Sequence, residues 1–167
     1  GYGEFVGQVV GAIRAADAAL VVIDAIDGPQ VGTARAWKYA RLAGKPRAAF
    51  VNRLDRDRAD FATTLEAMRG NHGKNVIIPL YYPVGSEANF SKVVNVLFDK
   101  DIPAEIADQV AECRALWMDV IAETDEELMM RYLDGEELTD EEIAKGLVTA
   151  VHNCKAIPIF VGSVAKD

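Results

Sequence analysis

A four-residue segment that follows a short apolar run could recognise a nucleotide base. Asn52, Arg53, Leu54 and Asp55 come directly after residues 48–51 (AAFV). Asp55 could accept two hydrogen bonds from one edge of guanine, the N1–H and the 2-amino group, and adenine lacks this pair of donors. Charge-assisted hydrogen bonds contribute about 1.5–3 kcal/mol each, and adenine would leave the carboxylate without partners. The segment therefore predicts a site that selects guanine.

The four residues alone leave a second interpretation open. Asn and Asp are common in turns, so a strand that runs into a polar turn would have the same residues. In the guanine interpretation, Asn52 braces the loop and reaches the other edge of the purine, while the stem of Arg53 lies flat over the ring. Asp24 and Asp27 also follow an apolar run, and we expect strand-end and turn roles for them.

The elements that must position this segment alternate between helix and strand. Apolar residues recur at helical spacing within residues 5–16 and 33–43. Continuous apolar runs at 18–23 and 48–51 are typical of strands buried on both faces. The order predicts an α/β fold, a parallel sheet flanked by helices, in which ligands bind beyond the carboxyl ends of the strands.

The second half of the chain predicts further elements and no internal repeat. Residues 75–83 (NVIIPLYYP) predict a strand whose internal proline causes a break or an edge position. A helix is expected over residues 103–123, and another begins at Thr139, where Glu142 completes a capping box. Ile157–Val161 is a third candidate for a buried strand.

The charge of the chain is negative and unevenly distributed. The net charge of −8 on 167 residues argues against direct, sequence-independent binding to nucleic-acid phosphates. Fifteen acidic residues and two basic ones lie between Asp101 and Glu142. Such a run is usually a solvated face, and the alternative is an acidic docking surface for a basic partner.

The composition of the chain also indicates the cellular compartment in which the protein is found. Half of the chain is apolar, which is enough for a core. Cys113 and Cys154 have neither metal-ligand spacing nor a disulfide framework, so we expect reduced thiols and no metal site. No apolar run approaches the roughly 20 residues of a membrane span. We therefore expect a cytoplasmic protein without a membrane partner.

The chain resembles the GTP-binding domain of translation elongation factor G along essentially its whole length. Residues 16–28 (ADAALVVIDAIDG) are similar to the family's ADGAVLVVDAVEGV, and residues 52–56 (NRLDR) to its NKMDR. Two stretches are more specific. Residues 124–129 (TDEELM) and 132–139 (YLDGEELT) together resemble the family's DDELMEKYLEGEELT, and residues 162–167 (GSVAKD) resemble its GSAFKN. In this factor and its near relatives, an acidic helical insert lies between the two loops that contact guanine, which correspond here to residues 52–56 and 162–167.

The resemblance implies roles in guanine binding. Asn52 and Asp55 would read the base, and Arg53 would pack on it where the family has Lys. The main-chain N–H groups of the last loop would face the guanine O6, and a lysine would cover the other face of the ring. The residues of this loop are Ser163, Val164, Ala165 and Lys166.

The resemblance also implies a domain division and a partner. We expect a partial P-loop-GTPase sheet at 1–62, an inserted acidic α+β subdomain at 63–155, and a return to the GTPase domain at 156–167. In the family, the acidic helix engages the ribosomal stalk protein. The corresponding positions here are Glu105, Asp108 and Glu112.

The beginning of the chain departs from the family pattern. It starts at the glycine of the family's DxxG motif, so Gly1 is the expected phosphate-switch position, and no G-x-x-x-x-G-K-[ST] motif follows. That motif supplies the phosphate cradle and the Mg²⁺-binding hydroxyl. We therefore expect a fragment of a longer protein. GTP or GDP and Mg²⁺ would bind the full-length protein, and the fragment alone would be inactive and free of cofactor.

A second departure concerns hydrolysis. Tyr2 stands where translational GTPases carry the histidine that orients the attacking water, and a phenol with a pKa near 10 is a poor base at neutral pH. The resemblance implies a ribosome-dependent GTPase that drives translocation. The alternative is a catalytically weak GTP-binding paralogue that binds or regulates the ribosome, and a protection or release-factor relative fits less well. We expect no sequence-specific DNA binding.

Overall fold

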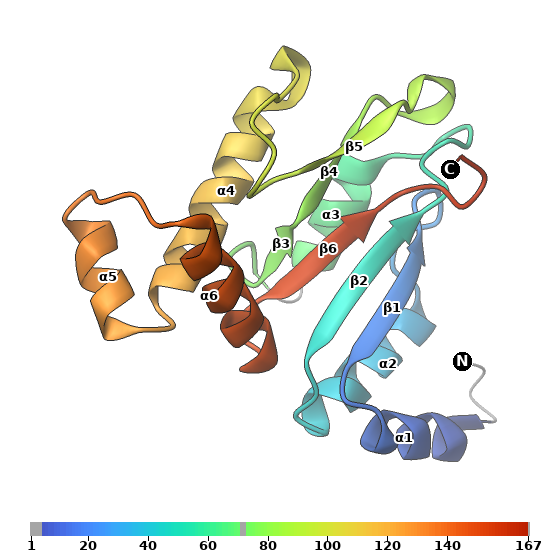
Figure 1. The fold of residues 1–167 in the computed structure, drawn as a ribbon. Helices are drawn as coiled ribbons and strands as arrows, with labels where there is room; N and C mark the ends of the chain where they lie inside the picture. Colours follow the sequence, from blue (N-terminus) through green and yellow to red (C-terminus); the bar gives the residue numbers. More distant parts are fainter. Residues whose placement is uncertain (1–4, 71–72, 167) are drawn as a thin grey trace.

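The computed structural model describes residues 5–70 and 73–166, and its centre is a four-stranded sheet. The strand order is β1-β2-β6-β3 and every neighbouring pair is parallel. Figure 1 shows that the arrows of β1, β2 and β6 point toward the same end of the molecule. The strands are β1 (Ala19–Asp24), β2 (Arg47–Asn52), β3 (Ile77–Pro79) and β6 (Ile157–Val161).

Helices flank this sheet, as the alternation of patterns predicts. The first three are α1 (Val6–Ala15), α2 (Val31–Leu42) and α3 (Phe61–Arg69). In Figure 1, α2 and α3 lie behind the strands. Trp37 from α2 and Met68 from α3 join Ile23 and Val51 of the sheet in one buried cluster. The α/β fold class is thus confirmed, with a parallel sheet covered by helices.

One face of β1 differs from the prediction. The apolar run predicts burial on both faces, but Leu20 and Val22 are 61% and 62% exposed. Val21 and Ile23, which point to the opposite face, pack in the core. The expectation is wrong for the first face because β1 is an edge strand and α2 and α3 pack on the opposite side.

The remaining elements form a second packed unit. Strands β4 (Tyr81–Val84) and β5 (Lys92–Asn95) pair antiparallel, joined by the 3-10 turn η2 (Glu87–Asn89). After the turn η3 (Ala104–Ile106) come α4 (Ala107–Ala122), α5 (Glu126–Leu133) and α6 (Asp140–His152). Trp117 of α4 is fully buried at the centre of this unit, and its Nε1–H donates to the Pro79 carbonyl at 2.8 Å.

The proline in the 75–83 segment has the predicted effect. It ends β3, and the chain resumes as β4 in the other sheet. The division of the chain at residue 62 stays a prediction. The packing favours grouping residues 63–79 with the main sheet, because β3 pairs with β6 and α3 contributes Leu65 and Met68 to the main core.

Local signals set the ends of the last two helices. Thr139 caps α6, and the Glu142 carboxylate accepts from the Thr139 N–H at 2.8 Å, so the predicted capping box is confirmed. Asp125 caps α5 by accepting from the N–H groups of Glu127 and Leu128. Across the described ranges, no helix has the length and apolar character needed to cross a bilayer.

Candidate functional site

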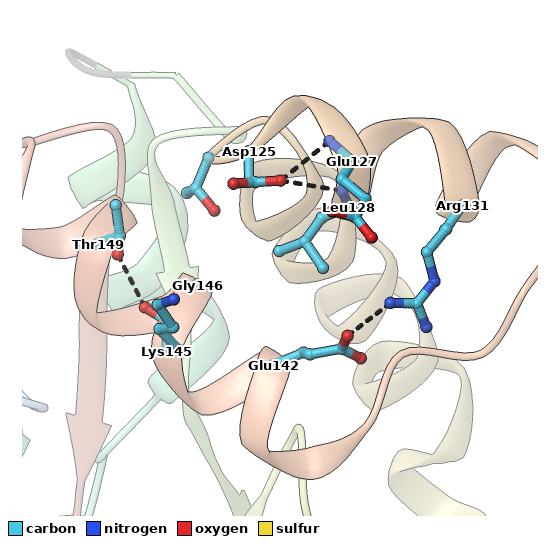
Figure 2. A pocket seen from close by; sticks show the side chains of 9 residues that line it. Asp125, Glu127, Leu128, Arg131, Glu142, Lys145, Gly146 and Thr149 are labelled. Carbon is cyan, nitrogen blue, oxygen red and sulfur yellow. Dashed lines mark hydrogen bonds and ion pairs between the residues drawn. The ribbon is translucent and has the colours of Figure 1, made fainter.

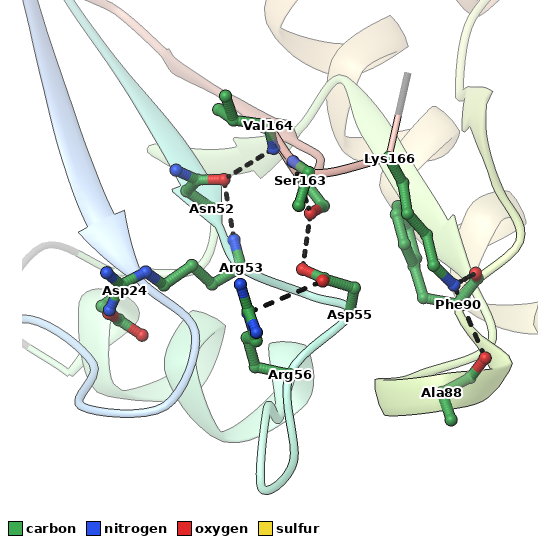
Figure 3. A network of polar contacts seen from close by, with 11 residues as sticks. Asp24, Asn52, Arg53, Asp55, Arg56, Ala88, Phe90, Ser163, Val164 and Lys166 are labelled. Carbon is green, nitrogen blue, oxygen red and sulfur yellow. Dashed lines mark hydrogen bonds and ion pairs between the residues drawn. The ribbon is translucent and has the colours of Figure 1, made fainter.

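The loops after β2 and β6 meet at the carboxyl end of the sheet. Parallel pairing places Val51 beside Val161, so the loops that follow β2 and β6 begin side by side. The Leu54 N–H donates to the Gly162 carbonyl at 3.5 Å. Figure 3 shows Asn52 and Asp55 of the first loop directed toward Val164 and Ser163 of the last loop. The sheet thus brings together residues that are more than 100 positions apart in the sequence.

Asp55 lies at the centre of this meeting point. The Ser163 hydroxyl donates to Asp55 Oδ1 at 2.5 Å, and Arg56 Nε lies 3.7 Å from Oδ2. The hydrogen bond from Ser163 lowers the pKa of Asp55, and the charges of Arg56 and Lys166 add to the effect. Asp55 is therefore an ionised acceptor at neutral pH, as a reader of the guanine N1–H and 2-amino group must be.

Asn52 connects the two loops. Its Oδ1 accepts from the N–H of Arg53 at 2.8 Å and from the N–H of Val164 at 3.2 Å. Asn52 therefore braces the first loop, as we expect from the sequence, and it also ties this loop to the last one. A contact between Asn52 and a purine stays a prediction.

Arg53 is held by a partner that sequence reasoning missed. Its NH1 group donates to Asp24 Oδ2 at 2.7 Å, at the end of the neighbouring strand β1. The residue has a left-handed backbone, with φ of 67°. The sequence alone predicts only a strand-end role for Asp24. The signal that could have found this pair is the register of two parallel strands, which places Asp24 beside Asn52.

The last loop is internally hydrogen-bonded. The N–H of Ala165 donates to Ser163 Oγ at 3.2 Å, and the N–H of Val164 is engaged with Asn52 as described above. Lys166 Nζ donates to the Phe90 carbonyl at 2.8 Å and to the Ala88 carbonyl at 3.5 Å. The predicted contacts of this loop with the guanine O6 and ring stay predictions.

The predicted docking residues lie apart from these loops, near the start of α4. Glu105, Asp108 and Glu112 are all exposed, and their spacing places them on one side of the helical segment. Glu112 is paired with Lys74, and this hydrogen bond lowers the pKa of Glu112. Glu105 and Asp108 therefore offer the less neutralised part of the patch.

A cavity of about 410 Å³ lies between α5 and α6 (Figure 2). Arg131 spans it and donates to Glu142 at 2.5 Å and to Glu136 at 2.9 Å. The hydrogen bond from Arg131 and those from Thr139 lower the pKa of Glu142 to about 2. Because Arg131 of α5 pairs with Glu142 of α6 across this cavity, we interpret it as a structural clamp between the two helices.

Two predicted positions, Gly1 and Tyr2, lie outside the described residues. Within the described part of the chain, no group of three or more His, Cys, Asp or Glu side chains could hold a metal ion.

Comparison with known proteins identifies the family. The sequence model of the elongation factor Tu GTP binding domain matches residues 1–166. The crystal structure of a protein from Thermus thermophilus matches 98% of this chain with a TM-score of 0.84 and 35% sequence identity. This chain spans 26% of the length of that protein. The chain belongs to the family of elongation factor Tu GTP-binding domains and is a GTP-binding domain of the translational GTPase type.

Proposed function

We propose that this chain provides the base-reading part of the guanine nucleotide site in a longer, cytoplasmic translational GTPase of the elongation factor G type. The observation that carries the proposal is the hydrogen bond between Ser163 and Asp55 at the carboxyl end of the sheet. It holds an ionised carboxylate where a nucleotide binds in a parallel α/β sheet. Asn52, Arg53 and residues 164–166 complete the proposed pocket.

Competition binding to the full-length protein tests this pocket. A fluorescent GDP is displaced with GDP, with IDP and with ADP. IDP keeps the N1–H and the O6 of guanine but lacks the 2-amino group, so it isolates one of the two hydrogen bonds to Asp55. We expect affinity to fall from GDP to IDP and again to ADP. Equal displacement by GDP and ADP would refute a guanine site.

The parent protein would use GTP and Mg²⁺ to drive movement of tRNA and mRNA on the ribosome. The acidic insert between the two guanine loops supports this role in translocation, because it resembles the insert of elongation factor G. Assays of ribosome-stimulated GTP hydrolysis and of translocation, both with the full-length protein, test this role directly. Stimulated hydrolysis without movement of mRNA would favour another step on the ribosome.

We also propose that Glu105, Asp108 and Glu112 dock the basic surface of the ribosomal stalk protein. Exposure of all three on one side of the helical segment supports this role. Replacing Glu105 and Asp108 with lysine should weaken stalk binding, and raising salt should weaken the wild-type complex because exposed charges are screened. Asp140 and Glu141 on α6, replaced in the same way, provide a matched control. Salt-independent binding would argue against electrostatic docking.

A second candidate is a GTP-binding paralogue with weak hydrolysis, and Tyr2 is the residue that favours it. In the full-length protein, Tyr2→His should raise ribosome-stimulated hydrolysis, because an imidazole holds and polarises water better near neutral pH. The GDP affinity of this variant serves as the control and should not change. No gain in hydrolysis would remove Tyr2 as the reason for weak activity.

A further inference from the structure

We infer that the turn from Gly85 to Phe90 positions the guanine-reading loops, and that Glu87 is the positioning residue. The inference rests on the proposed guanine site and assigns a role to a segment that the family resemblance leaves without one. The turn connects β4 to β5, so it belongs to the small antiparallel sheet. It reaches both loops that enclose the proposed base pocket.

Glu87 contacts the first loop with both its backbone and its side chain. Its N–H donates to the Leu54 carbonyl at 2.9 Å. Its carboxylate Oε1 accepts from the Arg58 N–H at 2.6 Å. These two bonds bracket Asp55, the proposed reader of the base, from either side along the chain.

The turn contacts the second loop through its carbonyl groups. Lys166 Nζ donates to the carbonyls of Ala88 and Phe90, at 3.5 and 2.8 Å, and lies 5.9 Å from the centre of the Phe90 ring. Figure 3 shows the Lys166 side chain extended alongside Phe90. One short turn is therefore bonded to the loops that follow two different strands.

Steric contacts and packing restrict the conformation of the turn. Gly85 has φ of 75°, and a Cβ at this position would lie 2.2 Å from the Asn89 carbonyl oxygen, so only glycine fits. Phe90 is 6% exposed and is anchored in the main core. Glu87 and Arg58 both have left-handed backbones, with φ of 53° and 67°. Non-glycine residues keep such conformations only where surrounding contacts hold them, and here the two residues hold each other.

This arrangement predicts an effect on discrimination between bases. If Glu87 holds the Asp55 loop in register, loss of its carboxylate should loosen the contact with the guanine 2-amino group. GDP binding would then weaken more than IDP binding, because IDP lacks that group. A purely structural role for Glu87 would weaken both nucleotides equally.

The experiment compares Glu87→Gly and Glu87→Gln in the full-length protein. Glycine accepts the left-handed backbone without strain and keeps the N–H bond to Leu54, so the protein should fold while only the carboxylate is lost. Glutamine keeps an oxygen that can accept from the Arg58 N–H. Exposed Glu137, replaced by glycine and by glutamine, provides the matched control. The readouts are the Kd values for GDP and IDP and the melting temperature.

We expect Glu87→Gly to reduce the preference for GDP over IDP by about 2- to 10-fold, the range of a single hydrogen-bond contribution. Glu87→Gln should restore most of the preference, and the Glu137 variants should match wild type. An unchanged ratio in Glu87→Gly, whether or not its melting temperature falls, would overturn the role of Glu87. A wild-type protein that binds GDP and IDP equally would instead overturn the proposed guanine site itself.

Discussion

Ser163 Oγ donates a hydrogen bond of 2.5 Å to Asp55 Oδ1, and 108 positions of sequence separate the two residues. This contact joins the loop after β2 to the loop after β6. It also orients the Asp55 carboxylate and keeps it ionised, because the hydrogen bond lowers its pKa. Ser163 therefore orients the proposed base reader and favours its ionised form.

Asp55→Asn should change the base preference of the full-length protein. The amide can donate to the 2-oxo group of xanthine but cannot accept both donors of guanine. Loss of two charge-assisted hydrogen bonds of about 1.5–3 kcal/mol each predicts at least a roughly 100-fold loss in GDP affinity. Competition binding with GDP and XDP measures this change in base preference. Asp57→Asn in the same loop is the control, and unchanged guanine preference in Asp55→Asn would remove Asp55 from base recognition.

Ser163→Ala should raise the pKa of Asp55 toward its ordinary value, because the largest cause of the lowering is removed. A carboxyl whose pKa is lowered by folding stabilises the native state above its ordinary pKa of 3.8, and this contribution is lost as pH falls through the lowered value. The variant should therefore lose part of this stabilisation. Carboxyl titration by NMR measures the shift, and an unchanged Asp55 pKa would contradict the role of the hydroxyl.

Glu142→Gln should remove a pH-dependent part of the stability of the α5–α6 clamp. The pKa of Glu142 is lowered from 4.5 to about 2, so wild type should melt at a higher temperature than the variant near neutral pH. The difference should shrink as pH falls below about 4.5 and vanish below about 2, where both side chains are neutral. Melting curves of wild type and Glu142→Gln over this pH range test the predicted pH dependence. A difference that persists below about pH 2 would show that charge is not the cause.

Gly146→Ala should destabilise the packing of α6 on α4. An added Cβ would lie 2.6 Å from Ile121 Cγ2, and overpacking of this kind costs about 1–3 kcal/mol. The measurement is denaturant unfolding of Gly146→Ala alone and in the background of Ile121→Ala, which removes the clashing atom. The cost should be smaller in the second background. An equal cost in both would mean that the contact with Ile121 is not responsible.

Several elements can be predicted from local patterns because local forces decide them. The capping box at Thr139 and Glu142, the break at Pro79 and the strand Ile157–Val161 are all expected and are all present. For the capping box and the proline the deciding interaction lies within a few residues along the chain, and the strand is indicated by its own apolar run although it pairs with the distant strands β2 and β3. The prediction for β1 is wrong on one face because burial depends on which elements cover a strand, and the run of apolar residues does not contain that information.

One part of the candidate site can be predicted from the local sequence, and another part is determined only by the fold. The order of residues in the segment Asn52–Asp55 is sufficient to suggest guanine recognition, because the chemistry of a carboxylate and an amide is local to them. The tertiary structure decides which groups surround that carboxylate. Parallel pairing of β2 with β6 brings Ser163 to Asp55, the register of β1 brings Asp24 to Arg53, and the β4–β5 turn brings Glu87 against the same loop. These contacts span 29 to 108 positions, and only the folded sheet determines distances of that kind.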